Sequence, residues 1–309
     1  MPIKEMDKKM ENDLKRQVKG KILLREPLKR HTTFKIGGPA DMWVEPRDTK
    51  ELKKVLRFAK EHGIPLAVIG GGSNLLVKDT GIEGIALHLG APFFKKASVR
   101  GNVVTVSAGH SISSLVRLCC NEALSGMESL VGIPGTVGGA LYMNAGGSSN
   151  PIFKNIGEFV FSVKVMDYDG NIKTLKKDRI EFGYRKSSLS SCIILQVVFK
   201  LEKADRSVLS SSCSKFLTMK RQKQALDVPS AGCIFKNPSG FQFTCGQMIE
   251  MLGLKGKKLG GAEISEKHAN FIVNRGKASA EDVTKLINFI KDKVKKNYNI
   301  DLELEIKVL

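Results

Sequence analysis

The chain has 309 residues, of which 42% are hydrophobic and 26% are charged, close to the values of ordinary globular proteins. This composition excludes disordered, collagen-like and coiled-coil proteins. No apolar run approaches the roughly 18 residues that a membrane-spanning helix requires. The length predicts about two domains. The formal net charge of +19 is the one unusual value, and the excess of lysine and arginine is spread along the whole sequence.

This basic charge attracts polyanions in general, but it does not by itself indicate sequence-specific recognition of nucleic acid. The sequence contains no helix-turn-helix, zinc-finger or ribonucleoprotein signature. We therefore expect no specific nucleic-acid partner and no membrane, and we interpret the charge as a lysine-rich solvated surface. A basic cleft for a diphosphate ligand is compatible with that interpretation.

Residues 1–30 are predicted to form a charged lead-in that is helical in part. They include acids such as Glu5 and Asp7 and no long apolar stretch, so we expect neither a secretory signal nor a transit peptide, and hence a cytoplasmic protein. The six cysteines contain no Cys-x-x-Cys pair, and we expect free thiols. The five histidines are scattered, and we expect no metal site.

The first clear helix is predicted to start after Asp48, because Asp48 and Glu51 have the spacing of a capping box. Gly63 is expected to end it, and its apolar face is formed by Leu52, Val55, Leu56 and Ala59. A buried strand at residues 64–69 is then predicted to run directly into a glycine-rich loop.

Further strands are predicted at residues 84–89, 103–107, 160–166, 172–175 and 193–201. The sequence Asp-Tyr-Asp-Gly-Asn at residues 167–171 has the composition of a turn, so we expect a hairpin around it.

A change of composition near residues 202–212 is the predicted domain boundary. Beyond it we expect a basic helix at about residues 210–224 and a second helix at residues 279–296, which begins with a Ser279-x-x-Asp282 capping box. Residues 300–308 alternate strictly between apolar and polar side chains. This alternation predicts a half-buried strand whose polar side carries three carboxylates, Asp301, Glu303 and Glu305.

Two segments are richer in glycine than ordinary connections: residues 70–76, with the sequence GGGSNLL, and residues 132–147, which begin GIPGTVGGA. Glycine lets backbone N–H groups approach a phosphate closely. Neither segment is a Walker P-loop, and neither fits the Gly-x-Gly-x-x-Gly dinucleotide fingerprint. Each loop alone is compatible with a tight structural turn or with a phosphate cradle. Two such loops together indicate a cofactor that bears a pyrophosphate.

These loops belong to an ordered series of motifs. HTTFKIGG at residues 31–38 precedes both loops. After them come FGYR at 182–185, PSAGCIFKNP at 229–238, GLKG at 253–256, SEKHANFIVN at 265–274 and LELE at 302–305. Any one of these is weak, but their order resembles the UDP-N-acetylenolpyruvoylglucosamine reductase family from about residue 25 to the C-terminus. The length, without an inserted segment in the C-terminal part, is similar to the family's shorter subtype.

The resemblance implies an α+β fold with an FAD-binding domain of the vanillyl-alcohol-oxidase type at residues 31–204. A smaller α/β substrate-binding domain is implied at residues 205–309, with its last strand returning to the active site. FAD is expected to be noncovalent, because serine and asparagine stand where covalent members of that superfamily can have a histidine nearby. The implied cofactor-binding residues are Gly70, Gly71, Gly72, Ser73, Asn74, Leu75, Gly132, Pro134, Gly135, Gly138, Gly139, Ala140 and Asn144.

The implied activity is the reduction of UDP-N-acetylglucosamine enolpyruvate to UDP-N-acetylmuramate, a step of peptidoglycan precursor synthesis. NADPH is the implied co-substrate that reduces FAD. Hydride then passes from flavin N5 to C3 of the enolpyruvyl group, and a proton is added at C2. This chemistry needs a cation on the substrate carboxylate, an acid that assists it and a proton donor.

Arg185 matches the family's cation, since a guanidinium offers a planar fork to a carboxylate and keeps its charge. Glu305 matches the family's acid near the substrate carboxylate. Taken alone, both residues also fit ordinary surface positions. Glu303 and Asp301 are interpreted as solvated surface residues.

Cys233 is a departure from the family's motif, in which this position is usually a serine that serves as the proton donor. A thiol has an ordinary pKa of about 8.5 and can donate a proton at neutral pH. We expect Cys233 to be the donor and to make the protein sensitive to thiol alkylation. The alternative is a small buried cysteine, with water as the donor.

The matched stretches imply further substrate-binding residues: Tyr184, Arg221, Lys236, Asn237, Lys255, His268 and Asn270. Arg221, Lys236 and Asn237 match positions that contact the UDP-sugar or its phosphates. His268 also fits a packed core histidine, and Tyr184 a core tyrosine. The sequence does not determine the oligomeric state, and we expect a monomer.

Two alternative functions are compatible with parts of the sequence. One is a flavoenzyme of the same superfamily that acts on a different small substrate. The other is a basic nucleotide-binding or nucleic-acid-binding protein that has lost catalysis, which would bind polyanions in a strongly salt-dependent manner. Neither explains the whole ordered set of motifs.

Overall fold

The computed structural model describes residues 3–147 and 152–309. The chain divides into two compact units that are interleaved along the sequence. Unit 1 comprises Met1–Glu26, Asp41–Gly71 and Glu83–Thr218, and unit 2 comprises Pro27–Ala40, Gly72–Ile82 and Met219–Leu309. The expected domains were continuous, with a division between residues 204 and 205, and that division stays a prediction.

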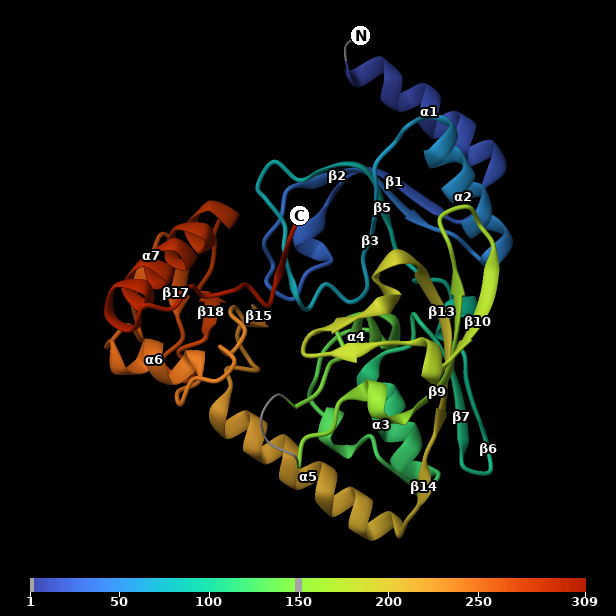
Figure 1. Ribbon diagram of the computed structural model, residues 1–309. Helices are drawn as coiled ribbons and strands as arrows, with labels where there is room; N and C mark the ends of the chain where they lie inside the picture. Colours follow the sequence, from blue (N-terminus) through green and yellow to red (C-terminus); the bar gives the residue numbers. More distant parts are fainter. Residues whose placement is uncertain (1–2, 148–151) are drawn as a thin grey trace. The chain divides into compact units, whose positions relative to one another are not determined.

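Unit 1 is built on two sheets (Figure 1). One has the strand order β1-β2-β5-β3, with β1 Lys21–Pro27, β2 Pro39–Glu45, β3 Leu66–Val68 and β5 Ile82–Leu87. The other has the order β10-β9-β13-β7-β6, with β6 Ala97–Arg100, β7 Val103–Ser107, β9 Val160–Met166, β10 Ile172–Lys176 and β13 Ile193–Lys200. Two short pairs join β8 Leu124–Ser125 with β14 Glu202–Lys203 and β11 Phe182–Gly183 with β12 Lys186–Ser187.

The helices of unit 1 share one apolar core with these sheets. They are α1 Ile3–Gln17, α2 Thr49–Glu61, α3 Ile112–Asn121, α4 Val137–Tyr142 and the first part of α5 Arg206–Lys223. Short 3₁₀ helices of unit 1 occur at η2 Pro92–Lys95, η3 Glu128–Leu130, η4 Ile156–Phe159, η5 Lys177–Arg179 and η6 Ser188–Ser191, and a further one, η1 Leu28–Arg30, belongs to unit 2. The Sγ atoms of Cys120 on α3 and Cys213 on α5 lie 3.2 Å apart, and both cysteines are free thiols.

Unit 2 has its own core around a sheet in the order β15-β18-β17-β16. Its elements are β4 Leu75–Leu76, β15 Ser230–Cys233, β16 Lys258–Leu259, β17 Ala262–Ile264, β18 Phe271–Asn274, β19 Lys307–Val308, α6 Cys245–Met251 and α7 Ala280–Tyr298. Helix α7 packs on β16 and β17. Strand β19 pairs in parallel with β4, so the end of the chain is hydrogen-bonded to the last two residues of the first glycine-rich segment.

Several predicted elements are confirmed. Strands β7 and β9 have the predicted bounds, and β9 forms the predicted antiparallel hairpin with β10. Helix α7 begins with the predicted capping box, because Ser279 Oγ accepts a hydrogen bond from Asp282 N and Asp282 accepts one from Ser279 N. Its predicted apolar face is buried: Val283, Leu286, Ile287, Ile290 and Val294.

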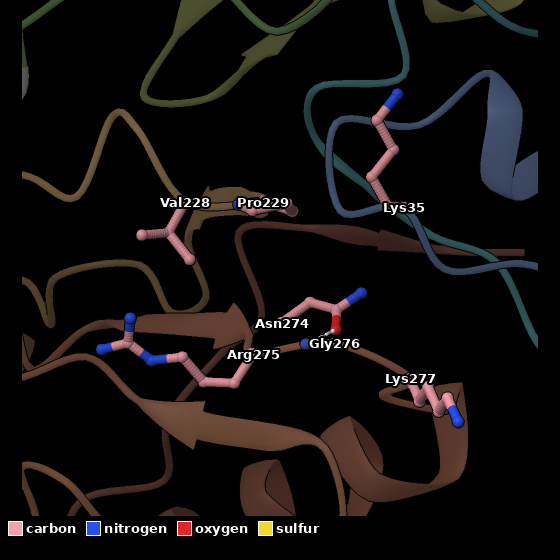
Figure 2. A pocket seen from close by; sticks show the side chains of 7 residues that line it. All are labelled: Lys35, Val228, Pro229, Asn274, Arg275, Gly276 and Lys277. Carbon is pink, nitrogen blue, oxygen red and sulfur yellow. Dashed lines mark hydrogen bonds between the residues drawn. The ribbon is translucent and has the colours of Figure 1, made fainter.

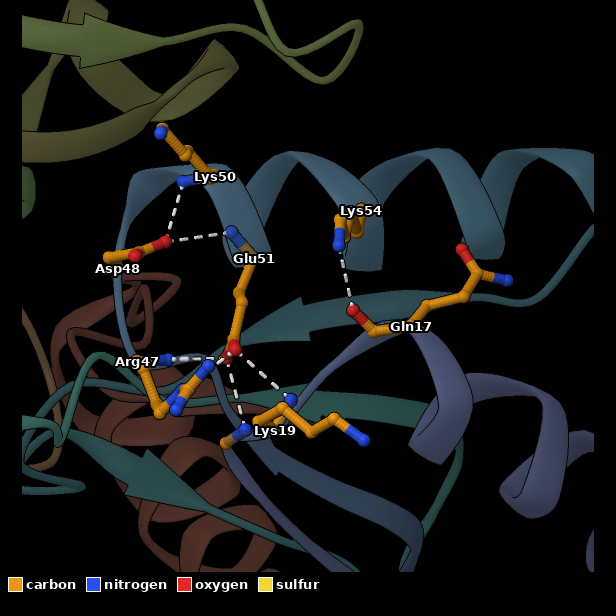
Figure 3. Close-up of polar contacts among 8 residues, drawn as sticks. Gln17, Lys19, Arg47, Asp48, Lys50, Glu51 and Lys54 are labelled. Atoms are coloured by element: carbon orange, nitrogen blue, oxygen red, sulfur yellow. Dashed lines mark hydrogen bonds and ion pairs between the residues drawn. The ribbon is translucent and has the colours of Figure 1, made fainter.

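The capping box predicted for α2 is only half correct. Asp48 does cap the helix, since its Oδ1 accepts hydrogen bonds from Lys50 N and Glu51 N. The Glu51 carboxylate does not bond back to the N–H of Asp48. It accepts hydrogen bonds from three backbone N–H groups and from the Arg47 guanidinium, as Figure 3 shows: Lys19 N, Gly20 N, Arg47 N and Arg47 Nε. Glu51 therefore fixes the turn between α1 and β1.

Four further expectations are corrected. Residues 1–30 are not only a lead-in, because β1 is a strand of a sheet. The buried strand expected at residues 64–69 is shortened to β3, whose residue Val68 is 41% exposed. Helix α5 begins at Arg206, earlier than the expected start at about residue 210. The expected strand at residues 300–308 is reduced to a single bridge at Leu304 and the short β19.

Within the described residues, the structure holds no helix that is both long and apolar enough to traverse a lipid bilayer.

Candidate active site

In unit 1 the two glycine-rich segments meet backbone to backbone. A Cβ atom on Gly71 would lie 2.5 Å from the Cα of Gly135, and one on Gly70 would lie 2.8 Å from Thr136 Oγ1. Real side chains do not tolerate such distances, so both positions require glycine. The structure therefore brings together the two loops that the sequence singled out.

The N–H groups at the start of α4 are already used within the protein. They donate to backbone or hydroxyl oxygens in the pairs Val137 N to His110 O, Gly138 N to Ala108 O, Gly139 N to Thr136 Oγ1 and Ala140 N to Thr136 O. Gly138, Gly139 and Ala140 can therefore offer a cofactor a close backbone approach, whereas hydrogen-bond donors must come from other positions of the two loops.

A pyrophosphate fits this pair of loops, because they present small residues and backbone rather than bulky side chains. The first loop continues into unit 2, where Gly72 has φ +63° and its carbonyl accepts a hydrogen bond from Thr33 N at 3.1 Å. Asn144 of the second segment, predicted to bind the cofactor, has its side-chain amide engaged elsewhere. It donates to Gly183 O at 3.0 Å and accepts from Gly157 N at 3.1 Å.

Asn144 thereby holds the hairpin that carries Arg185. Strands β11 and β12 pair Gly183 with Lys186, so Tyr184 and Arg185 form its two-residue turn. Arg185 has φ +55°, a left-handed conformation that a non-glycine residue rarely adopts. Such strain typically persists where the surrounding structure over-determines it, often at functional sites.

The Arg185 side chain is also held in place. Its Nη2 donates to Gly146 O at 3.3 Å, and its guanidinium carbon lies 5.1 Å from the centre of the Tyr184 ring. A cation over an aromatic face is stabilised by the ring quadrupole. Tyr184 is 36% exposed and is thus not the core tyrosine of the alternative interpretation.

In unit 2 the segment after β15 connects Cys233 to Glu305. Cys233 pairs with Phe271 at the end of β15. The following residues pair with the C-terminal segment: Glu305 N donates to Ile234 O at 2.8 Å, and Lys236 N donates to Glu303 O at 2.9 Å. The structure therefore brings two of the predicted catalytic residues to one short piece of backbone.

Glu305 differs from the other terminal acids in its burial. The side chains of Asp301 and Glu303 are 84% and 76% exposed, whereas Glu305 is 8% exposed. Strict alternation would have placed all three on one solvated face. The backbone instead turns after Leu304, and this turn takes Glu305 out of solvent while leaving Glu303 free to pair with Lys236 at 3.0 Å.

Asn74 supports Glu305 from the first glycine-rich loop. Its Nδ2 donates to Glu305 O at 3.0 Å, and its own carbonyl accepts from Lys307 N at 2.9 Å. A residue predicted to bind the cofactor therefore also fixes the backbone of the predicted acid.

A second cysteine lies beside this pair. Burial raises the pKa of Cys245, and the nearby Cys233 and Glu305 raise it further. Cys245 is fully buried at the start of α6, and its N–H donates to Asn237 Oδ1 at 3.0 Å. Its thiol is protonated at neutral pH, and it contributes no negative charge to the surroundings of Glu305.

The remaining predicted substrate residues differ in whether their side chains are exposed, paired with another side chain or buried. Arg221 is exposed near the end of α5. Lys255 pairs with Glu250. Burial, and after it the charge of Lys255, lowers the pKa of His268, so its ring is neutral at pH 7 and its Nδ1 accepts from Asn270 N at 3.2 Å. Asn270 is buried, and its side chain is bonded to backbone.

A cavity of about 510 Å³ in unit 2 lies apart from the predicted site residues. It is lined by Lys35, Val228, Pro229, Asn274, Arg275, Gly276 and Lys277. Figure 2 shows that its three basic side chains point away from one another. Arg275 is paired with Glu263 at 2.8 Å. These cations do not converge on a common ligand position.

The sequence analysis missed the supporting role of three asparagines. Asn144 holds the Arg185 hairpin, Asn74 holds Glu305, and Asn270 holds the segment after Cys233. Their presence inside the matched motifs was visible in the sequence. Their partners were not, because each bond joins segments far apart in the chain.

Comparisons with known proteins agree with the motif series. Residues 223–309 match the model of the UDP-N-acetylenolpyruvoylglucosamine reductase C-terminal domain, and residues 40–176 match an FAD binding domain. The UDP-N-acetylenolpyruvoylglucosamine reductase of Moorella thermoacetica is 40% identical over 297 residues, 96% of both chains. That of Bacillus pumilus is 40% identical over 303 residues, 97% of this chain and 98% of its own.

A solved structure supports the same relationship at the level of the fold. The UDP-N-acetylenolpyruvylglucosamine reductase of Thermus caldophilus superposes with a TM-score of 0.79 at 34% identity, over 94% of this chain and 98% of its own. These findings confirm the predicted α+β architecture, an FAD-binding domain together with the family's C-terminal domain, and the predicted flavin-dependent oxidoreductase class. The chain belongs to the UDP-N-acetylenolpyruvoylglucosamine reductase family.

Proposed function

We propose that this protein uses NADPH to reduce the enolpyruvyl group of UDP-N-acetylglucosamine enolpyruvate, giving UDP-N-acetylmuramate. The observation that carries the proposal is the withdrawal of Glu305 from solvent beside Cys233, while the neighbouring acids of the same terminal segment stay exposed. A buried carboxyl group and a thiol on paired backbone segments are suited to proton transfer.

When bound, FAD supplies the hydride chemistry, accepting hydride from the nicotinamide and delivering it to the enolpyruvyl double bond. The loop pair around Gly71 and Gly135 would hold its pyrophosphate, since backbone without side chains is what that group can approach closely. The protein's own contribution is then to bind the substrate and to stabilise the charge that develops on it.

Arg185 binds the substrate carboxylate in this proposal. Addition of hydride at C3 moves negative charge from the double bond toward the carboxylate, and a guanidinium fork stabilises that charge without losing its own proton. The strained hairpin turn and the contact with Gly146 O hold the side chain in one orientation before substrate arrives. A preorganised cation needs no rearrangement as the charge develops.

Glu305 and Cys233 complete the reaction. Glu305 acts as the assisting acid: it lends a proton to the substrate carboxylate as negative charge develops there, and it takes the proton back when Cys233 Sγ–H gives its own proton to C2. The resulting thiolate is reprotonated from solvent, since Cys233 is half-buried rather than sealed. The bond from hydride to C3 and the bond from the thiol proton to C2 together saturate the double bond.

The UDP moiety is assigned to the basic residues of unit 2. Lys236 and Asn237 lie three and four residues after Cys233, and Arg221 is an exposed cation near the end of α5. Cations and amide groups suit a diphosphate. Lys236 is already paired with Glu303, so substrate binding at this position would exchange one anion for another.

Flavin absorbance tests this function. The purified protein should show a flavin band that anaerobic NADPH bleaches and that the enolpyruvyl nucleotide then restores in the absence of oxygen. If only oxygen restores the flavin band, the protein is still a flavoenzyme, but the proposed substrate is refuted. A colourless protein that FAD does not reconstitute would support the alternative of a non-catalytic polyanion-binding protein.

The preference for NADPH over NADH, a cytoplasmic location and a monomeric state stay predictions. Steady-state rates with the two nicotinamides and the mass of the purified protein in solution test the first and the last of these.

A further inference from the structure

Asn270 makes an unusual set of hydrogen bonds. Its side-chain Oδ1 accepts from Phe235 N at 3.0 Å, and its Nδ2 donates to Phe235 O at 2.8 Å. Its own carbonyl accepts from Ile234 N at 2.8 Å. One residue therefore satisfies three backbone groups in the two residues that follow Cys233.

This pattern continues a sheet with a side chain. Strand β15 pairs with β18 up to Cys233 and Phe271, and there the ladder stops. The Asn270 amide has the same donor and acceptor as a peptide group and takes the place of the next backbone partner. On this edge both backbone polar groups of Phe235 are therefore hydrogen-bonded, as they would be inside a sheet.

The opposite edge of the same segment carries Glu305. Ile234 O accepts from Glu305 N at 2.8 Å, and Phe235 forms a bridge with Leu304. The backbone between Cys233 and Lys236 is thus the common support of the proposed proton donor and the proposed acid. Phe235 is therefore connected through backbone pairing to both residues: it is two positions from Cys233 and bridges Leu304, the neighbour of Glu305.

We propose that Asn270 is a positioning residue for the reduction reaction, fixing through its double hydrogen bond to Phe235 the spacing of the Cys233 thiol and the Glu305 carboxyl group. The proposal rests on the proposed function, and it replaces the expectation that Asn270 binds substrate. Asn270 is 3% exposed, and its amide already accepts from and donates to Phe235, so it lacks the access that a direct ligand contact requires.

The same strand region offers a matched control. Asn274, 8% exposed, also bonds to backbone in both directions, donating to Phe34 O at 3.1 Å and accepting from Gly276 N at 2.9 Å. Neither Phe34 nor Gly276 belongs to residues 233–236 or to residues 303–305, which carry Cys233 and Glu305. Replacement of Asn274 therefore removes comparable buried hydrogen bonds without disturbing the spacing of those two groups.

The test separates the two halves of the reaction in the holoenzyme by stopped-flow absorbance. N270A should slow reoxidation of the reduced flavin by the enolpyruvyl nucleotide about 100-fold, the order of effect expected for a misplaced catalytic group, and should leave reduction by NADPH within about twofold. N274A should lower the melting temperature about as much as N270A does, and it should leave the rates of both half-reactions unchanged.

N270D gives a second readout, a pH profile that a merely structural residue would not produce. The ionised carboxylate cannot donate to Phe235 O, whereas the protonated carboxyl group can. The reoxidation rate of N270D relative to the wild-type protein should therefore rise as the pH falls. If N270A does not fold, N270D decides by this criterion.

Three results would overturn the proposal: equal loss in both half-reactions of N270A, the same selective loss in N274A, or a pH profile of N270D parallel to that of the wild type. A wild-type protein that is reduced by NADPH but not reoxidised by the nucleotide would instead refute the proposed function.

Discussion

The two units support their proposed catalytic residues in different ways. In unit 1, Arg185 stands at the tip of a two-residue hairpin turn with a positive φ, and Asn144 and Gly146 of one segment contribute hydrogen bonds that hold this hairpin and its side chain. In unit 2, Cys233 and Glu305 are held by hydrogen bonds among the first glycine-rich loop, β15, the residue before β18 and the C-terminal segment.

This difference has an energetic consequence. The Arg185 turn stores local backbone strain, which costs of the order of 1–3 kcal/mol and can be relieved without affecting the rest of the unit. The support of Glu305 stores no such strain but depends on long-range pairing, so a change there affects several segments. Stability and activity should therefore be separable at Arg185 and coupled at the backbone around Glu305.

The largest effect is expected for Glu305→Gln. The amide keeps the shape of the side chain and leaves the backbone bonds of residue 305 to Ile234 and Asn74 intact, but it cannot transfer a proton. Loss of a general acid typically costs about 10²–10⁴-fold in rate. Single-turnover oxidation of the reduced flavin by the nucleotide should show this loss, with flavin reduction by NADPH unchanged. Turnover within about tenfold of the wild type would exclude Glu305 from catalysis.

Arg185→Gly should separate activity from stability. Removal of the guanidinium should slow substrate reduction about 10²–10³-fold, the range seen when a preorganised stabilising donor is lost. Glycine accepts the positive φ without a Cβ clash, so urea unfolding should show a gain of about 1 kcal/mol. Arg185→Lys is the matched control: it keeps the charge and the strained backbone, and it should recover part of the rate without the gain in stability.

Cys233→Ser should have a small effect on rate and a large effect on chemical sensitivity. Serine is the residue expected at this position from the family's motif, so turnover should stay within about tenfold of the wild type. Iodoacetamide should inactivate the wild-type protein and not the variant. Cys213→Ser removes a half-exposed thiol outside the proposed site and should not protect. Equal inactivation of the Cys233 variant would show that another thiol is responsible.

Much of the fold could be predicted where its determinants are local. The limits of β7 and β9, the turn at residues 167–171 and the start of α7 depend on neighbouring residues, and the sequence contains all of them. Candidate residues of the site could also be named, because each lies in a recognisable motif. The support of those residues could not be predicted, since the partners of Asn74, Asn144 and Asn270 are set by tertiary pairing.

Glu51 and Glu305 are two residues whose local structure could not be predicted from sequence spacing. Sequence spacing predicted a capping box for Glu51 and a regular strand for Glu305. In the structure, the turn at Lys19 and Gly20 supplies Glu51 with stronger partners than its own helix does, and the pairing with Ile234 draws Glu305 out of the alternation. In both cases a distant backbone segment outweighs a local preference.

Glu51→Gln should therefore have the smallest effect on the reaction, because it breaks long-range support in a place remote from any proposed catalytic residue in the sequence. The variant should lose about 2–3 kcal/mol of stability to urea, as bonds to a charged acceptor are replaced, while both half-reactions keep their rates. Asp48→Asn, which preserves the helix cap, should change stability by less than about 0.5 kcal/mol.

Burial raises the pKa of Glu51, but the hydrogen bonds from Arg47 and Lys19 outweigh it and leave the pKa below its ordinary value of 4.5. The charged form is therefore favoured by folding, so its contribution is present above pH 4.5 and disappears as the pH falls through the lowered folded-state pKa. The stability difference between wild type and Glu51→Gln should shrink in acid; a difference that stays constant from neutral pH to about pH 3 would show that shape, and not charge, fixes the turn.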